Sequence, residues 1–589
     1  MSSVRTVVAV TVLVVAASSV ATVGGAVGTA TAGDDPGGLT DADASPDESA
    51  SAVASAGGVE RDDAERARRA ANGTNETDEE TERNGSHAGV VQTVTYARTP
   101  GERGSIRATH RYRVGPNASS VVVYDYENAA VLESNGFVRR SNGRWTWDGR
   151  VDRPSLTLRI HVNGSESDAD SAGEFGGPEW VDTGRWSLAH PPVEFAYRSD
   201  ARGGWAYSWR DPALVERRTR FDGAGYDGSA VVYLGAHETY ETSAAGQRLR
   251  LVRPRGVSER GTDPDRVLDT LATAAEQLDV GARDRLVNAF AAPEPLGRGG
   301  LTAAGRNGSQ DFWVAANRTV TAPTNLWVHE YVHTRQNLSL GPGMAWFREA
   351  SATYYAGVLS VRQGVDGREG FERFAERLRA NATADAVLAS RSTWSTPMAP
   401  YRKGMRVLAA LDARIRDATD RNRTLVDVFR RLNEHPGTVG YDDFAAVVAN
   451  VSGASLSDWL DAHVRGSARA NPPTAPWPYT DPSGSADADG DGLTSDAERR
   501  LGTHPFAADT DGDGRNDGHE VALGTDPLDA DTDRNGTSDG FELATGRPLL
   551  GPVAGSTTAD WTPISGLLGW YAGGIAVVGP AANGSASRP

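Results

Sequence analysis

The sequence VHEYVH occupies residues 328–333, and WFREASATYY follows it at residues 346–355. In a helix, His329 and His333 are one turn apart on the same face, so both imidazoles can bind one zinc ion. Glu330 is offset from that face, where its carboxylate can reach a water molecule in the open position of the metal. The spacing therefore predicts a catalytic zinc site. An amphipathic helix with two structural histidines is the alternative interpretation of the bare pattern.

A second helix is expected to supply a third ligand. Gly and Pro at residues 341–343 should end the first helix, and a second helical stretch follows. Glu349 in this stretch would complete the two-histidine, one-glutamate ligand set of a catalytic zinc site and leave the fourth position for water. Its neighbours Ala350 and Ala352 are small enough to let the two helices pack closely. The predicted zinc ligands are therefore His329, His333 and Glu349.

These blocks resemble known peptidase motifs. HEYVH and WFREASATYY resemble the HExxH and WxxEGxxxY pair of the gluzincin zinc peptidases. PYRKG at residues 400–404 resembles the Tyr-x-Lys-Gly segment of the aminopeptidase N and glycyl aminopeptidase families, and residues 401–432 are most similar to the glycyl aminopeptidase family. The resemblance covers about residues 263–467, and the β-rich residues before them are more loosely similar to the N-terminal domain of that family.

The resemblance implies a thermolysin-like zinc peptidase that acts as an aminopeptidase, with an endopeptidase as the alternative. It implies that Glu330 accepts the proton of a zinc-activated water and passes it to the leaving amine, and that Tyr401 stabilises the oxyanion. The chain departs from the family at Ala350, which replaces the usual Gly, and in having no recognisable PDZ-like segment. No convincing Gly-x-Met-Glu-Asn aminopeptidase signature lies near the zinc helix. The partly similar fragment GAHE at residues 235–238 lies well upstream and is more typical of a strand end.

The C-terminal region contains an internal repeat. DADGDG, DTDGDG and DTDRNG begin at residues 487, 509 and 531, and so recur every 22 residues. Each loop has oxygen-bearing side chains at positions one, three and five, Gly at six and Glu at twelve, which is typical of calcium loops. Position nine is Asp in the second and third loops, whereas Ser495 occupies it in the first. The predicted calcium ligands are Asp487, Asp489, Asp491, Glu498, Asp509, Asp511, Asp513, Asp517, Glu520, Asp531, Asp533, Asn535, Asp539 and Glu542.

The segments between the loops, LGTHP at 501–505 and LGTDP at 523–527, resemble thrombospondin type 3 repeats. Calcium ions would stiffen this region into a stalk, because without them the carboxylates repel one another and few apolar residues are available for burial. An acidic, solvated linker is the alternative interpretation.

Composition divides the 589 residues into several units. We expect a multidomain chain, with a β-sandwich-like N-terminal domain of short strands and a mainly helical α+β domain that carries the zinc site. The expected segments are a signal peptide at 1–32, a disordered acidic linker at 33–89, a β-rich domain at 90–253, a zinc peptidase domain at 263–467, a Pro-rich linker at 468–486, calcium-binding repeats at 487–547 and a tail at 548–589.

The N-terminus indicates export. Arg5 precedes the apolar run at 6–23, and small residues at 30–32 form a cleavage pattern, which together are typical of a secretory signal peptide. An uncleaved membrane anchor is the alternative. The chain has no Cys, so it has neither disulfides nor a lipid-modified Cys. Asn-x-Ser/Thr acceptors recur along the chain, as expected for a glycoprotein at the cell surface or outside the cell.

The charge pattern bears on partners and habitat. A formal net charge of -18 argues against a nucleic-acid partner, which needs clustered basic residues. Lys403 is the only lysine, and this acidic, Arg-rich composition resembles proteins of salt-loving archaea. A peptide or protein is the expected substrate, and the stalk or tail is a candidate for association with the cell envelope. Within the tail, residues 561–578 are a borderline membrane segment. The alternative to an enzyme is a calcium-stiffened surface or adhesion protein with a peptidase-like scaffold.

Overall fold

The chain divides into two compact units between Pro478 and Tyr479, and each is described by itself. The expected signal peptide and the segment 561–578 lie outside the described residues. The same holds for the acidic linker except its last residue. No helix in the described ranges is long and apolar enough to cross a membrane. The computed structural model describes residues 89–99, 101–126, 128–162, 180–200, 203–208, 215–256, 263–281, 283–293, 300–303, 309–380 and 385–550.

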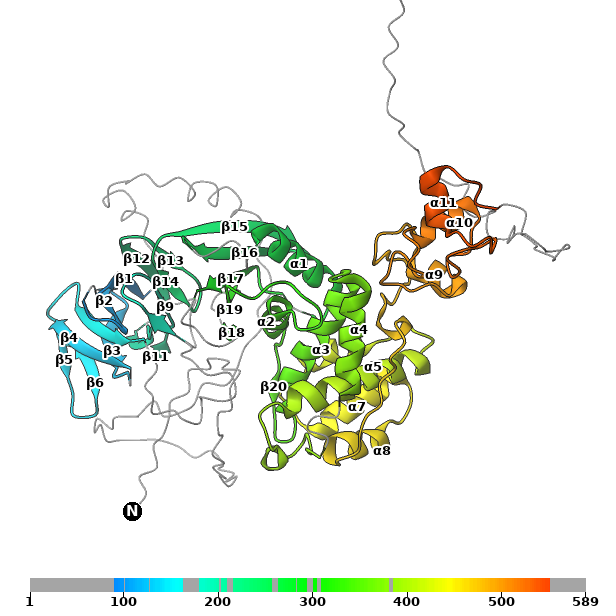
Figure 1. Ribbon diagram of the computed structural model, residues 1–589. Helices are drawn as coiled ribbons and strands as arrows, with labels where there is room; N and C mark the ends of the chain where they lie inside the picture. The colour runs from blue at the N-terminus through cyan, green and yellow to red at the C-terminus, as the bar shows by residue number, and fades with distance from the viewer. Residues whose placement is uncertain are drawn as a thin grey trace, which may run out of the picture. The chain divides into compact units, whose positions relative to one another are not determined.

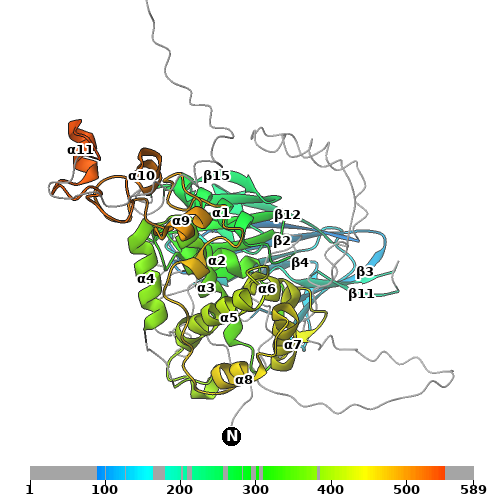
Figure 2. The ribbon, with the colours of Figure 1, turned by 90° about the vertical axis from the view of Figure 1, so that its right-hand side faces the viewer.

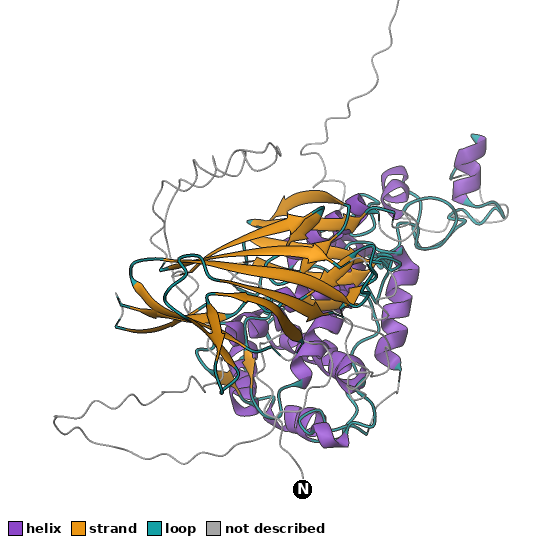
Figure 3. Ribbon diagram, turned by 90° about the vertical axis from the view of Figure 1, so that its left-hand side faces the viewer, coloured by secondary structure: helices purple, strands orange, loops and turns teal. Residues whose placement is uncertain are grey.

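Two five-stranded sheets form the N-terminal part of the first unit (Figure 1; Figure 3). Val94 and Leu158 of the first sheet and Val121 and Phe195 of the second belong to one hydrophobic core. Along Ser105–Val114 and Ser155–His161 of the first sheet, buried residues alternate with more exposed ones, so this sheet turns one apolar face to the core. The first sheet has the order β12 (Val215–Asp222), β1 (Val90–Arg98), β2 (Ser105–Val114), β7 (Ser155–His161) and β4 (Ala129–Asn135). The second has the order β11 (Gly204–Tyr207), β10 (Phe195–Ser199), β3 (Ala118–Tyr124), β6 (Arg144–Trp147) and β5 (Phe137–Arg139).

The first unit has two further sheets in its described residues, a small four-stranded sheet and a mixed five-stranded sheet. In the mixed sheet, β16 (Gln247–Pro254), β17 (Leu286–Ala292) and β19 (Ser309–Ala315) run parallel, and β18 (Gly300–Ala303) runs antiparallel to β19 at the edge. The small sheet has the order β13 (Gly225–Asp227), β14 (Val232–Leu234), β9 (Ser187–Ala189) and β8 (Val181–Asp182). The mixed sheet has the order β15 (His237–Ala244), β16 (Gln247–Pro254), β17 (Leu286–Ala292), β19 (Ser309–Ala315) and β18 (Gly300–Ala303).

The mixed sheet crosses the boundary that the sequence predicted between residues 253 and 263. Residues 248–252 of β16 pair in register with residues 286–290 of β17, so the hairpin β15–β16 belongs to the sheet of the domain that carries the predicted zinc ligands, called the zinc domain below. Its alternating pattern indicates half-buried strands, but the pattern does not tell which sheet they join. The zinc domain therefore begins before residue 253.

Helices complete the first unit (Figure 2). Helical periodicity in the sequence at 405–418 coincides with α5 (Met405–Ala418), and that at 266–278 nearly coincides with α1 (Pro264–Gln277). The α-helices are α1 (Pro264–Gln277), α2 (Leu326–Thr334), α3 (Trp346–Arg362), α4 (Gly367–Arg379), α5 (Met405–Ala418), α6 (Leu425–Asn433), α7 (Tyr441–Ser452) and α8 (Ser457–Leu460). Short turns are the 3-10 helices η3 (Arg391–Thr393) and η6 (Trp477–Tyr479) and the π-helical turns η4 (Pro400–Gly404) and η5 (Asp461–Arg465).

Helix α2 is shorter than the sequence predicts. It begins after Asn325, whose side chain accepts a hydrogen bond from the backbone N–H of Val328 at 3.4 Å and so caps the helix. It ends at Thr334, before the Gly-Pro-Gly at 341–343. The intervening backbone becomes extended because β20 (Ser339–Leu340) pairs in parallel with β21 (Thr438–Val439).

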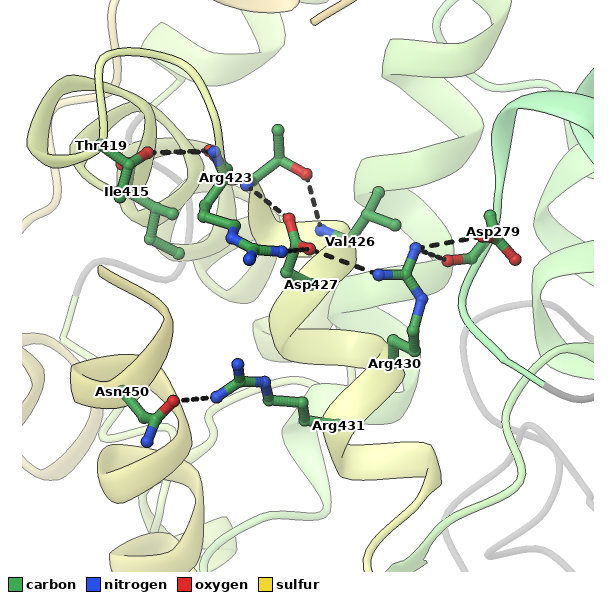
Figure 4. Close-up of polar contacts among 10 residues, drawn as sticks. Asp279, Ile415, Thr419, Arg423, Val426, Asp427, Arg430, Arg431 and Asn450 are labelled. Carbon is green, nitrogen blue, oxygen red and sulfur yellow. Dashed lines mark hydrogen bonds and ion pairs between the residues drawn. The ribbon is translucent and has the colours of Figure 1, made fainter. Parts of the chain in front are cut away.

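Helix α6 is fixed to its neighbours by polar contacts (Figure 4). Arg430 donates to Asp427 one turn earlier at 3.3 Å, and to the carboxylate of Asp279, just after α1, at 3.2 Å. Arg431 donates to the side chain of Asn450 on α7. These arginines join three helices around the zinc domain.

The described part of the second unit consists of three loop-and-helix repeats. Each helix ends at a glycine in the left-handed region, with φ of 88°, 86° and 71° at Gly502, Gly524 and Gly546. This conformation favours glycine and ends each helix after seven residues. The helices are α9 (Ser495–Leu501), α10 (Asp517–Leu523) and α11 (Asp539–Thr545).

The Pro-rich linker expected at 468–486 is divided between the two units. Its first part packs on the first unit, where Ala470 O accepts a hydrogen bond from Arg406 Nη2 at 2.8 Å. Its last part joins the first repeat, where Gly484 O accepts from the backbone N–H of Asp496 at 3.0 Å. Proline content predicts an extended chain, but it does not reveal the donors that bind the carbonyls of this segment.

Candidate functional site

Helices α2 and α3 bring the three predicted zinc ligands together. His329 Nε2 and His333 Nε2 lie 3.2 Å apart, and each lies 3.4 Å from Glu349 Oε2. Ligand atoms at the usual distance of about 2.0–2.1 Å from a tetrahedral zinc are about 3.4 Å from one another. The three atoms therefore have the spacing that a zinc ion requires.

The electrostatics of this triad also fit a cation. Glu349 Oε2 is buried without a hydrogen-bond partner, which is costly unless a positive charge satisfies it. Burial alone would raise the pKa of Glu349, but the neighbouring His333 and His329 outweigh burial and hold this pKa well below its usual range. Burial likewise acts to lower the pKa of His333, but Glu349 raises it above its ordinary value. The site therefore holds a carboxylate that stays ionised beside two histidine side chains, the ligand types of a catalytic zinc site.

Gln336 orients one ligand and links the two helices. His333 Nδ1 donates to Gln336 Oε1 at 2.9 Å, which leaves Nε2 available to a metal. Gln336 Nε2 in turn donates to Arg348 O at 2.7 Å and to Ser351 Oγ at 2.9 Å. These two partners flank Glu349 on α3, so Gln336 holds both ligand-bearing helices. Sequence reasoning missed this residue, because a lone Gln after a helix gives no signal of its own.

Glu330 lies on α2, and its side chain contacts the edge strand β18. Its carboxylate is buried, and Thr302 Oγ1 donates to its Oε2 at 2.7 Å. Burial raises the pKa of Glu330, although His333 and His329 oppose this effect. A raised pKa suits a group that must accept and then release a proton near neutral pH. Thr302 was also missed from the sequence, since the contact depends on the pairing of β18 with β19.

Tyr401 lies beside the zinc ligands, in the π-helical turn η4. Its ring stacks on that of His329, with centroids 6.0 Å apart and 14° between the planes. The turn is held by Lys403, whose Nζ donates to Ala386 O at 2.6 Å and to Gly466 O at 3.3 Å. π-Helical turns occur frequently at functional sites. The structure therefore brings Tyr401 to the same site as the helix α2 residues.

The carboxylates of the first two repeat loops also converge. Within each of these loops, the carboxylates at positions one, three and five lie within 4.8 Å of one another, namely Asp487, Asp489 and Asp491 in the first loop and Asp509, Asp511 and Asp513 in the second. Glu498 and Glu520, at position twelve, are fully buried, and their carboxylate oxygens have no hydrogen-bond partner. Burial, followed by repulsion from the nearby aspartates, raises the pKa of each glutamate to about 9. Each of these two loops thus has the oxygen donors, including a buried carboxyl group without a partner, that calcium would complete.

The side chains at position nine brace the loop backbone. Asp517 accepts hydrogen bonds from Thr510 N at 2.8 Å and from Thr510 Oγ1 at 2.6 Å. Asp539 accepts the hydroxyl of Thr532 at 2.6 Å in the third loop. Ser495 makes a different contact in the first loop, where its hydroxyl donates to Ala486 O at 3.1 Å.

The third loop differs from the first two. Asn535 Nδ2 donates to Glu542 Oε1 at 2.8 Å, so this glutamate has a partner within its own loop. The backbone N–H of Asn535 lies 3.1 Å from carboxylate oxygens of Asp531 and Asp533. The side-chain amide of Asn535 therefore satisfies one oxygen of Glu542, whereas both carboxylate oxygens of Glu498 and Glu520 have no hydrogen-bond partner.

Successive repeats are joined through glycines that sequence reasoning did not single out. Gly518 N donates to Asp491 Oδ2 of the preceding loop at 3.1 Å, and Gly540 N donates likewise to Asp513. A Cβ on Gly518 would lie 2.3 Å from Asp491 O, so no larger residue fits without a shift. The signal in the sequence was the recurring Asp-Gly pair at positions nine and ten.

Comparison with known proteins identifies the repeats. Residues 487–508 and 509–530 each match the family model described as Bacterial TSP3 repeat. The match confirms the resemblance of the first two repeats, and the third loop lies outside it. No curated protein matches the sequence.

Solved structures similar to this chain include an aminopeptidase N family protein and M1 zinc metallopeptidases. An aminopeptidase N family protein from Idiomarina loihiensis is 13% identical, with 65% of this chain and 76% of that chain covered and a TM-score of 0.44. An M1 zinc metallopeptidase mutant from Deinococcus radiodurans, bound to a Tyr-Ser-Ala substrate, is 14% identical, with 65% and 94% covered and a TM-score of 0.41. Aminopeptidase A from Legionella pneumophila, in complex with aspartic acid, is 11% identical, with 64% and 49% covered and a TM-score of 0.35. The chain is thus similar to M1 zinc metallopeptidase structures and, over residues 487–530, to Bacterial TSP3 repeats.

Proposed function

We propose that this chain is an exported, zinc-dependent peptidase that hydrolyses peptide bonds. The observation that carries the proposal is the triangle of His329 Nε2, His333 Nε2 and Glu349 Oε2, with sides of 3.2, 3.4 and 3.4 Å. Structural zinc sites are closed by four protein ligands, whereas three protein ligands leave a position for water and substrate. The adjacent buried Glu330 supplies the proton acceptor that such a site needs.

The residues have distinct roles in the proposed reaction. His329, His333 and Glu349 would hold the zinc ion, which supplies Lewis-acid chemistry for water and for the scissile carbonyl. Glu330 accepts a proton from the attacking water and delivers it to the leaving amine, for which its raised pKa is suited. The hydroxyl of Tyr401 donates a hydrogen bond to the oxygen on which negative charge develops.

The proposed specificity is that of an aminopeptidase, with an endopeptidase as the alternative. Support comes from the PYRKG segment, which resembles that of aminopeptidase families and carries Tyr401 in the turn η4. Paired peptides that differ only in N-terminal acetylation test this point. An aminopeptidase requires the free amino group, so cleavage of the acetylated peptide at an equal rate would indicate an endopeptidase.

We also propose that the repeats bind calcium and stiffen a stalk outside the cell, where the stalk or tail would associate with the envelope. The buried, partnerless carboxylates of Glu498 and Glu520 support calcium binding. Glycosylation is proposed as well, because every described Asn-x-Ser/Thr acceptor is exposed, namely Asn117, Asn317, Asn337, Asn422, Asn450 and Asn535.

A combined metal and digestion experiment tests the enzyme. The purified full chain is loaded with zinc, its metal content is measured, and a peptide library is digested with cleavage positions read by mass spectrometry. We expect roughly one zinc per chain in the catalytic site, and cleavage that disappears with a zinc chelator and returns with zinc. Correctly folded protein with neither zinc nor cleavage would instead favour a calcium-stiffened surface or adhesion protein with a peptidase-like scaffold.

A further inference from the structure

The edge strand β18 presents its inner face to the zinc helix. Residues 300 and 302 point to the same side of the strand, because side chains alternate along a strand. A Cβ on Gly300 would lie 2.7 Å from both Cγ and Oε1 of Glu330, so glycine gives the clearance that lets the strand approach. Thr302 is 2% exposed and faces the same glutamate.

The Thr302 hydroxyl has two acceptors on Glu330. Its Oγ1 lies 2.7 Å from the carboxylate Oε2 and 3.0 Å from the backbone carbonyl oxygen. One hydroxyl donates one proton at a time, and the nearer acceptor carries the larger negative charge. The bond to the carboxylate is therefore the stronger of the two contacts.

We propose that Thr302 is a positioning residue for Glu330, and that it acts by fixing the rotamer of the proton-accepting carboxylate. A hydrogen bond to Oε2 ties one oxygen of a side chain with three rotatable bonds and leaves Oε1 to accept the proton. Reaction rates fall steeply when a catalytic group is displaced by about 1 Å. The inference rests on the proposed function, because it takes Glu330 as the base.

Kinetics of three variants test the role of the hydroxyl. Thr302→Val removes the donor with little change of shape, and kcat should fall by at least about tenfold, since hydrogen bonds to charged groups are among the strong ones. KM and zinc content should stay near the wild-type values, because Thr302 holds the base and not the substrate or the metal. Thr302→Ser, which keeps the hydroxyl, should recover most of the rate. Thr109→Val is the matched control, because it removes a hydroxyl that lies 3.3 Å from Thr157 Oγ1 in the N-terminal sheet.

A double-mutant cycle tests the contact without any activity. The free energy of unfolding is measured for Thr302→Val, Glu330→Ala and the double variant. We expect non-additivity, with Thr302→Val costing clearly less stability when Glu330 is already absent. An additive cycle would overturn the contact itself.

The two experiments distinguish failure of the positioning role from failure of the proposed peptidase function. Wild-type kcat in Thr302→Val, or a Thr302→Ser variant as slow as Thr302→Val, would overturn the positioning role even if the cycle is non-additive. A wild-type chain that binds zinc but cleaves no peptide would overturn the proposed function, whatever the cycle shows.

Discussion

Gly404 lies directly against Ala350, such that a Cβ at position 404 would be only 2.7 Å from the Cβ of Ala350. The contact joins the turn η4, which carries Tyr401, to helix α3, which carries Glu349. This contact between two small residues therefore helps to position the proposed oxyanion donor relative to one proposed zinc ligand.

This contact predicts a compensating pair of substitutions. Gly404→Ala should destabilise the chain by about 1–3 kcal/mol, as overpacking does, and should lower kcat by displacing Tyr401. Adding Ala350→Gly removes the opposing Cβ and should recover much of the rate, despite a cost of about 1 kcal/mol for glycine within a helix. Urea denaturation and steady-state kinetics check both effects. Equal stability and kcat in Gly404→Ala and wild type would contradict the prediction.

Replacement of the proposed base should separate chemistry from metal binding. Glu330→Gln is expected to keep the fold and the zinc but to lower peptide hydrolysis by about 10²–10⁴-fold or more, because an amide cannot accept the proton of water. Zinc content and turnover are measured together. Glu369→Gln, at a carboxylate whose side chain is 84% exposed, is the control and should behave as wild type. Appreciable remaining turnover would remove Glu330 from the mechanism.

Loss of Glu349 should act mainly on the metal. Glu349→Ala removes the third proposed ligand, whereas the helix stays anchored by the buried Trp346 and Phe347. Zinc affinity should fall by more than the about 10–100-fold that loss of an outer-shell partner costs, and Gln336→Met provides that comparison. Competition with a zinc chelator measures both affinities. An unchanged affinity in Glu349→Ala would place the third ligand elsewhere.

The zinc chemistry should not require the repeats. A chain that ends at Pro478 keeps every hydrogen bond that residues 468–478 make with the first unit, including that of Arg421 to Trp477 O at 3.4 Å. We expect this shortened chain to bind zinc and to hydrolyse peptides at a rate close to that of the full chain. An inactive but folded and zinc-loaded product would mean that the repeats contribute to the active site. Ending the chain at Ser467 instead would remove Ala470, whose carbonyl binds Arg406, and should cost stability.

The calcium-free second unit should lose stability as pH rises. In the folded chain, burial and neighbouring carboxylates raise the pKa of Glu498 and Glu520 to about 9, that of Asp489 to about 7 and that of Asp511 to about 6. A carboxyl with a higher pKa in the folded state stabilises that state fully below its unfolded pKa, about 3.9 for Asp and about 4.3 for Glu, and this contribution is lost as pH rises through the folded values.

Limited proteolysis of calcium-stripped protein at pH 5, 7 and 9 measures this loss. Cleavage after residue 479 should increase with pH, and saturating calcium should suppress the increase because calcium binds the deprotonated carboxylates. Calcium-free repeats that resist protease better at pH 9 than at pH 5 would contradict the assignment.

Local patterns predicted much of the site. The i, i+4 spacing of His329 and His333 is a property of one helix, and the 22-residue period marks the repeat loops, so both can be read without knowledge of the tertiary fold. Glu349 could be added because it lies in the first turn of the next helical stretch, a short distance along the chain.

Contacts between distant segments could not be predicted. Thr302 meets Glu330 only after β18 has paired with β19, and β16 joins the zinc domain through a parallel register with β17. Strand alternation tells which side chains are buried, but it does not name the partner strand. The end of α2 was misplaced for the same reason, because the backbone before Gly341 follows a pairing with residues nearly a hundred positions away.

The amide-to-carboxylate links from Gly518 to Asp491 and from Gly540 to Asp513 join each described repeat of the second unit to the next, as in a linear array. The stability of such an array is a sum of terms for single members and terms for the junctions between them. Unfolding then starts most easily at an end, where only one junction must break, and proceeds inward one member at a time. Evolution can lengthen or shorten such a spacer by whole repeats without changing the sequence of any of them. Each added repeat brings one more contact between neighbouring repeats, which adds to the stability against unfolding.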